Sequence, residues 1–97
     1  MKIPPFRLRP EPLTEQAANL PGFKWADPEV GKRHQLGGDP NWIQQPERPR
    51  CPTCGQEMTF YGQLDSINDD ICLADAGIVY VFICFDDIIA TALIQSG

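Results

Sequence analysis

The cysteine pair Cys51 and Cys54 is the part of the sequence best suited to chemistry. Two residues, Pro52 and Thr53, separate the pair, and Gly55 follows it. Two thiolates at this spacing can hold one Zn²⁺ from a tight turn, and the glycine lets the chain curl back so that N–H groups face sulfur. The pair therefore predicts half of a metal site.

The other half of the site is expected at a second turn, because a structural zinc needs four ligands. Cys84 ends an apolar run, and the residue three positions further on is Asp87. A carboxylate oxygen binds zinc at about 2.0–2.2 Å, although it is a harder ligand than thiolate. We predict a structural Zn²⁺ held by Cys51, Cys54, Cys84 and Asp87.

Two alternatives stay open for this set. His34, Asp86 or a water molecule could take the fourth place instead of Asp87. The set could also be a metal-free relic whose thiols pack as small hydrophobic side chains. A disulfide is less favoured, because thiols stay reduced in a reducing cytosol. Cys72 lies in a polar stretch with apolar neighbours and is expected to be a packing residue.

Strands must position these ligands. The segment from Glu57 to Leu64 alternates apolar and polar side chains, which predicts a strand with one buried face. On this pattern Met58, Phe60 and Leu64 face the core, and Gly62 is a candidate bulge. The opposite face is expected to carry Thr59, Tyr61 and Gln63.

Two further strands complete the predicted sheet. Residues 78–85 form a continuous run of β-branched and aromatic side chains, typical of a central strand buried on both faces. Residues 88–95 are predicted to form the next strand, because Asp86 and Asp87 can make a tight turn before it. The sequence therefore predicts a mainly β fold, a small zinc-ribbon-like antiparallel meander of three strands.

The N-terminal half is different in character. All ten prolines lie at or before Pro52. Proline lacks an N–H and restricts the preceding residue, so long helices and central strands are disfavoured there. One short helix is predicted from Thr14, as its N-cap, to Leu20. We expect a single domain over residues 1–97, with 1–50 as an irregular wrapping segment and 51–97 as the cysteine-pair sheet.

Aromatic side chains in the wrapping segment are too many for a simple linker. They are expected to cover the open face of the sheet, and the alternative is that they form an exposed docking surface. The residues concerned are Phe23, Trp25, Trp42 and Ile43.

Charge divides the chain at the same place. Residues 1–50 carry eight basic and six acidic side chains, whereas residues 51–97 carry seven acidic side chains and no basic one. Phosphate binding needs Lys and Arg, so a basic protein surface is the better electrostatic complement. We expect a protein partner, and a homodimer through an exposed sheet edge is open. A nucleic-acid-binding zinc ribbon is the alternative, with Trp42 for base stacking and nearby basic residues.

Catalysis is not expected. The single histidine, His34, is more often a hydrogen-bonding residue than a base in such a setting. The pairs Asp69–Asp70 and Asp86–Asp87 are interpreted as solvated turns. Apolar runs are too short to cross a bilayer, and Met1 to Pro10 lacks the apolar core of a secretory signal. We therefore expect a bacterial cytoplasmic protein with no enzyme activity and no cofactor besides zinc.

From His34 onward the chain resembles the YwqG-like bacterial domains of unknown function, and it is similar to conserved segments of the programmed cell death protein two family. The residues that carry the resemblance are Leu36 to Gln44, Cys51 to Gly55, Met58, Phe60, Gln63, Leu64, Asp75 to Gly77, Val79 to Cys84, and Gln95 with Ser96. The resemblance implies a β-rich domain whose Gly-Gly-x-Pro-x-Trp segment covers the sheet beside a cysteine pair. Zinc-bearing relatives place a cysteine at the position of Asp87, and the family brings no established activity.

Overall fold

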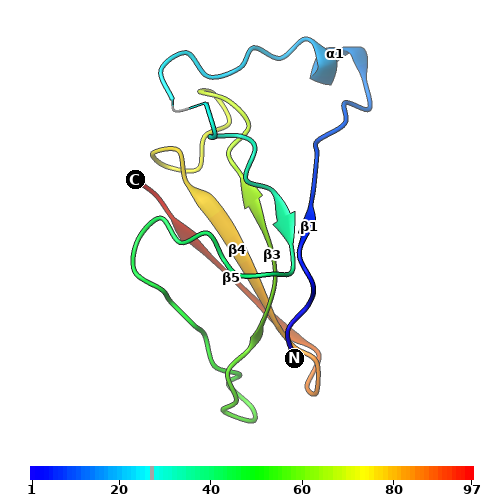
Figure 1. Cartoon of the computed structure of the whole chain (residues 1–97), viewed down its shortest axis with the longest axis vertical. Coiled ribbons are helices and arrows are strands. Elements are labelled where there is room, and N and C mark those ends of the chain that lie inside the picture. Colours follow the sequence, from blue (N-terminus) through cyan, green and yellow to red (C-terminus); the bar gives the residue numbers. More distant parts are fainter. Residues whose placement is uncertain (27) are drawn as a thin grey trace.

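The fold is one antiparallel sheet with an irregular N-terminal half. The structure is a computed structural model, and it describes residues 1–26 and 28–97. Five strands lie side by side in chain order (Figure 1). The elements are β1 (Phe6–Arg7), α1 (Glu15–Ala18), β2 (Gln35–Leu36), β3 (Thr59–Asp65), β4 (Ile78–Cys84) and β5 (Ile89–Gln95). Within the described ranges, no helix is long and apolar enough to cross a membrane.

The mainly β prediction is confirmed, and the sheet has five strands where the sequence predicted three. The strands predicted over 57–64, 78–85 and 88–95 correspond to β3, β4 and β5. The two added strands are only two residues long and lie in the proline-rich half, so they leave no periodic pattern to detect. The predicted cap of the short helix is also confirmed, because Thr14 Oγ1 accepts a hydrogen bond from the Ala17 N–H at 3.1 Å.

A bulge in β3 changes which side chains are buried. Phe60 pairs with Phe82 and Gly62 with Val81, so Tyr61 is the extra residue. The extra residue shifts the alternation by one position, and every later side chain changes face. Gln63 is therefore 1% exposed and Leu64 is 50% exposed. The prediction that Leu64 is buried and Gln63 is exposed is wrong for this reason.

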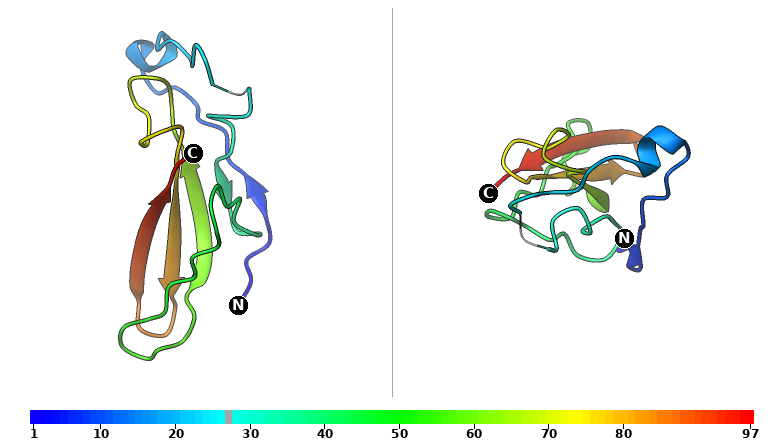
Figure 2. Two further views of the ribbon diagram at one scale, coloured as in Figure 1. Left: turned by 90° about the vertical axis from the view of Figure 1, so that its left-hand side faces the viewer. Right: turned by 90° about the horizontal axis from the view of Figure 1, so that it is seen from above.

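The core lies on one face of β3, β4 and β5. Its largest buried side chains come from β4, namely Ile78, Tyr80 and Phe82. Trp42 packs over them, with its ring centroid 4.9 Å from that of Tyr80 and 6.1 Å from that of Phe82. In Figure 2 the segment that contains Trp42 runs along this face of the three strands.

Hydrogen bonds from the sheet hold this segment in place. The Gln95 side-chain oxygen accepts from the backbone N–H groups of Ile43, at 3.1 Å, and Gln44, at 2.9 Å. The Tyr80 hydroxyl donates to the carbonyl of Asn41 at 2.7 Å. The prediction that Trp42 and Ile43 cover the sheet is thereby confirmed.

Trp25 does not take part in this cover and is 92% exposed. The backbone N–H of Lys24 donates to Asp69 Oδ2 at 3.0 Å, in the connection between β3 and β4. That contact holds the loop at the end of the sheet away from the core, in the upper part of Figure 1. The prediction that Trp25 covers the sheet is therefore wrong.

The second face of the sheet is open. Along β4 the side chains alternate between buried and half-buried, with Val79, Val81 and Ile83 on the second face. The prediction that this strand is buried on both faces is wrong, because Val79, Val81 and Ile83 are only half-buried on the second face. An apolar sheet surface is left facing outward.

A buried ion pair joins the end of β3 to the wrapping segment. Arg33 makes a two-pronged contact with Asp65, at 2.7 Å from Nη2 to Oδ1 and 2.8 Å from Nε to Oδ2. The N–H of Gly31 donates to the same carboxylate at 2.7 Å. Burial alone would raise the pKa of Asp65, but these donors and the guanidinium charge outweigh it and lower the pKa below its ordinary value.

Gly77, directly before β4, gives a test of the close packing at this end of the sheet. A Cβ there would lie 2.6 Å from the Gln95 carbonyl oxygen and also against that of Leu73. Because both neighbours are backbone atoms, we expect Gly77→Ala to lower the free energy of unfolding by about 2–3 kcal/mol in urea titrations. Gly22→Ala is the control, since a Cβ there meets nothing within 4 Å. Equal effects of the two substitutions would contradict this packing.

Candidate metal centre

Two turns at one end of the sheet carry the four predicted ligands. Cys51 and Cys54 lie in the turn that precedes β3, and Cys84 is the last residue of β4. Asp87 lies in the tight turn from β4 to β5. Because β3 and β4 are antiparallel, the start of one is beside the end of the other, at the lower end of Figure 1.

The turn around Cys51 and Cys54 has the shape that the sequence predicted. The Gly55 N–H donates to the Cys51 carbonyl at 2.8 Å, and the Cys51 N–H donates to the Gln56 carbonyl at 2.8 Å. Gly55 has a φ of +74°, a conformation that favours glycine. The chain thus curls back under the sulfurs, and a backbone hydrogen bond from Gln56 reaches Cys54.

The distances between the four candidate ligand atoms are compatible with one bound metal ion. The four atoms all lie within 4.8 Å of one another. Cys54 Sγ is 3.8 Å from Cys84 Sγ, and Asp87 Oδ2 is 3.2 Å from Cys51 Sγ and 3.7 Å from Cys84 Sγ. With Zn–S bonds of about 2.3 Å and a Zn–O bond of about 2.1 Å, a tetrahedron requires about 3.8 Å between sulfurs and about 3.6 Å between sulfur and oxygen. The cluster could therefore bind a metal.

Burial places the cluster at the margin of the core. Cys51 and Cys84 are buried, Asp87 is half-buried and Cys54 is exposed. None of the cysteines forms a disulfide. A metal held here would be closed off on the core side and would be reached from solvent past Cys54.

The electrostatics of the cluster are those of thiols grouped around one carboxylate. The backbone hydrogen bond from Gln56 lowers the pKa of Cys54, but desolvation and the contacts with Asp87, Cys51 and Cys84 outweigh it and raise the pKa to about 12. Hydrogen bonds from Cys51 and then Cys54 lower the pKa of Asp87. A bound cation would replace these hydrogen bonds and favour the deprotonated form of every ligand.

The other candidates for the fourth place lie elsewhere. His34 is buried at the opposite end of β3, where its Nδ1 accepts from the Asp65 N–H at 3.0 Å. Asp86 is exposed and does not belong to the cluster. Cys72 lies in the connection between β3 and β4, half-buried, and its sulfur accepts from the Ala76 N–H at 3.1 Å. Asp87 is therefore the residue that the fold brings to the three thiols.

Comparisons with known proteins give a relative but no function. Over 50 residues the chain is 44% identical to an uncharacterized protein of Salmonella typhimurium, YpfL. This match covers 52% of the chain and 12% of that protein. The chain matches no model of a known protein family and no solved structure.

Asp87→Cys is expected to raise the zinc affinity by about tenfold or more, because thiolate is the softer and stronger ligand. Competition with a chromogenic chelator measures the change. Asp86→Cys is the matched control, since it adds a thiol to the same turn outside the cluster. A gain of the same size in the control would assign the effect to an extra thiol rather than to the fourth ligand position.

Proposed function

We propose that this chain is a small protein-binding module without enzyme activity, and that a structural zinc ion stabilises its zinc-ribbon-like sheet. Three thiols and one carboxylate supply four ligands from the protein itself, which is typical of closed structural sites rather than of catalytic ones. A thiolate-rich tetrahedral set favours zinc over the harder cations Mg²⁺ and Ca²⁺.

The single observation that carries the binding proposal is the composition of the open sheet face. Residues on this face form three rows across the strands, and none of them is charged. The rows are Leu64–Val79–Ile94, Gly62–Val81–Ala92 and Thr59–Ile83–Ala90. Leu64 is 50% exposed and Ile94 is 55% exposed. A contiguous apolar surface of this kind marks an interaction site in a protein of this size.

Charge indicates what kind of partner would fit. The acidic residues of the 51–97 segment lie around the apolar rows rather than within them, and no basic residue accompanies them. Exposed members of this acidic set are Glu57, Asp69, Asp70, Asp75 and Asp86. The complementary partner surface is apolar at its centre and carries Lys and Arg at its rim. A reducing cytoplasm suits such a module, because the ligand thiols stay free there.

A paired capture experiment tests this proposal. Bait proteins are the wild type, the double variant Leu64→Lys/Ile94→Lys, and the control Ile71→Lys, all checked for folding. Ile71 is about as exposed as the other two but lies in the connection between β3 and β4. We expect host proteins that bind the wild type and the control and that are lost with the double variant. Recovery that is the same with all three baits would sink the proposal.

The nucleic-acid alternative is less well supported. Trp42, the candidate for base stacking, packs against Tyr80 and Phe82, and Arg48 lies 5.8 Å from its ring centroid. A base would have to displace these neighbours before it could stack. A homodimer through the edge strand β5 stays a prediction.

A further inference from the structure

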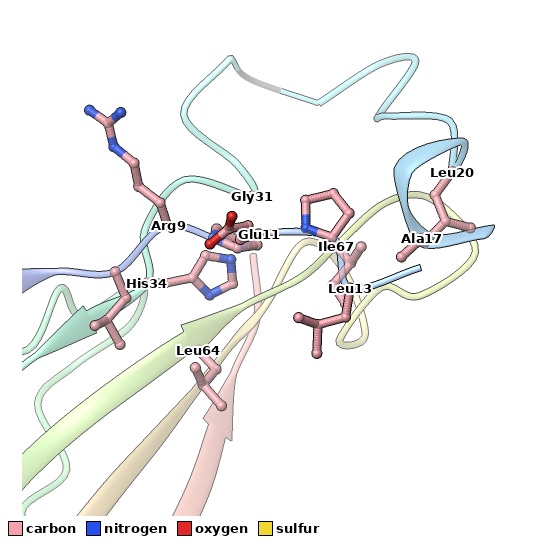
Figure 3. A pocket seen from close by; sticks show the side chains of 12 residues that line it. Arg9, Glu11, Leu13, Ala17, Leu20, Gly31, His34, Leu64 and Ile67 are labelled. Atoms are coloured by element: carbon pink, nitrogen blue, oxygen red, sulfur yellow. The ribbon is translucent and has the colours of Figure 1, made fainter. Parts of the chain in front are cut away.

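A second feature lies at the end of the sheet away from the cysteines. It is a cavity of about 600 Å³ between residues 8–20 and the end of β3, shown in Figure 3. Its walls are mostly apolar, with Leu13, Leu64 and Ile67 among the side chains that line it. The volume is within the range of pockets that bind small molecules.

His34 gives this cavity an unused hydrogen-bond donor. The side chain is 7% exposed and lines the cavity. Its Nδ1 accepts from the Asp65 N–H, so in the neutral imidazole the proton is on Nε2. Nε2 is buried and has no hydrogen-bond partner in the part of the chain that the structure describes. An unpaired buried donor destabilises the fold unless a ligand satisfies it.

One basic residue, Arg9, lines the cavity, and two more line a hollow beside it. A second hollow of about 440 Å³ shares Arg9 with the cavity and is also lined by Arg7 and Lys32. Glu11 is the one acidic residue in the lining of the two hollows. In the lining of the two hollows, three basic residues thus face one acidic residue, in a chain whose net charge is −5.

Few backbone hydrogen bonds hold the chain segment over the cavity. The Leu8 N–H donates to the His34 carbonyl at 3.1 Å, which ties the segment down at its start. From there to residue 13 the backbone makes no hydrogen bond with any other described residue, and these side chains are exposed. A small displacement of residues 9–13 would open a path to His34 Nε2 without breaking a backbone hydrogen bond.

We propose that this cavity binds a small amphipathic carboxylate. The apolar body lies against Leu64 and Ile67, and the carboxylate accepts the His34 Nε2–H. Arg9 lies on the rim, with its guanidinium pointing away from His34 in Figure 3, and attracts the carboxylate from there. An apolar pocket with one or two placed polar groups is the usual form of a small-molecule site. This site is separate from the metal centre, and it shares Leu64 with the open sheet face. Its test uses a small ligand and no partner protein, so it does not depend on partner binding.

Titration of the isotope-labelled full chain with octanoate, followed by NMR, tests the proposal. We expect saturable shifts of the His34 ring signals and of the amides of residues 9–13, 64 and 67, with a Kd below about 1 mM. Octylammonium carries the same tail with the opposite charge and is expected to bind at least about tenfold more weakly. No saturable shift, or equal binding of the two amphiphiles, would overturn the proposal.

Variants identify the groups that hold the head of the ligand. His34→Asn keeps an oxygen that can accept the Asp65 N–H but has no donor at the position of Nε2, and is expected to weaken octanoate about tenfold. Arg9→Gln, on the exposed rim, is expected to weaken octanoate binding about threefold. This variant tests the site even if His34→Asn does not fold. Lys24→Gln removes the same charge outside both hollows and is expected to change nothing. If Lys24→Gln matches Arg9→Gln, the attraction is general electrostatics and the assigned site is wrong.

Discussion

Removing zinc from the loaded protein with a chelator is expected to lower its free energy of unfolding by at least about 4 kcal/mol. The ion would join the turn at Cys51 and Cys54 to the turn at Cys84 and Asp87, and the small core offers little to replace that link. Urea titrations with and without chelator measure the difference. Trp42 fluorescence reports unfolding, because this ring is packed on Tyr80 in the folded chain.

Two cysteine variants separate this effect from a general loss of thiols. Cys84→Ser removes a ligand, so its unfolding curve should no longer respond to the chelator. Cys72→Ser removes a thiol outside the cluster, and its response should equal that of the wild type. Wild-type curves that coincide with and without chelator would show that no metal contributes to stability.

Asp65→Asn is expected to lower the free energy of unfolding by about 3 kcal/mol at neutral pH, measured in urea titrations. The substitution removes the carboxylate that contacts the Arg33 guanidinium in a partly buried place and that also accepts the Gly31 N–H. Because the folded state lowers the pKa of Asp65, its contribution is present above the unfolded pKa of about 3.9 and is lost as the pH falls through the folded pKa. The difference between wild type and variant should therefore shrink on acidification.

Asp75→Asn is the matched control for this prediction. It makes the same chemical change at an exposed position in the connection before β4. Its effect should stay within about 0.5 kcal/mol at every pH. A pH-independent difference between wild type and Asp65→Asn would show that the variant acts through packing rather than through the charge of the carboxylate.

The sequence was sufficient to predict the long strands and to single out the four residues that cluster as candidate ligands. Residues 78–84 are continuously apolar, and Asp87 follows Cys84 at the same spacing that joins Cys51 to Cys54. Such local patterns predict contacts in the folded chain, because a tight turn between antiparallel strands places the residues on either side of it next to each other. The four candidate ligands come together at one end of β3 and β4 for this reason.

The arrangement around Gly62 was harder to predict. A Cβ at Gly62 would lie 2.8 Å from the Gln35 carbonyl, so this glycine admits β2 beside β3. A glycine inside a strand signals either a bulge or a close backbone approach, and here it accompanies both. The bulge shifts the alternation of buried and exposed side chains by one position and so buries Gln63. The pattern of apolar residues in the sequence does not show this shift. Gly62 is the one residue in the sequence that indicates the close approach of β2.

The pairing of Arg33 with Asp65 and the burial of His34 could not be predicted for another reason. These residues are more than thirty positions apart in the chain, and their contact depends on how the wrapping segment crosses the end of β3. In the sequence, each of these residues is as compatible with an exposed position as with a buried one. The open sheet face was missed because β4 has the composition of a strand covered on both sides.

Native mass spectrometry of tag-free protein is the most direct test of the central claim, that Cys51, Cys54, Cys84 and Asp87 hold a structural zinc ion. The wild type and Asp87→Ala are compared under the same conditions. We expect about one zinc ion per wild-type chain and a reduced or absent zinc-bound species in the variant. A folded wild type that carries no metal would contradict the account, and the cluster would then be a set of packed thiols beside a carboxylate.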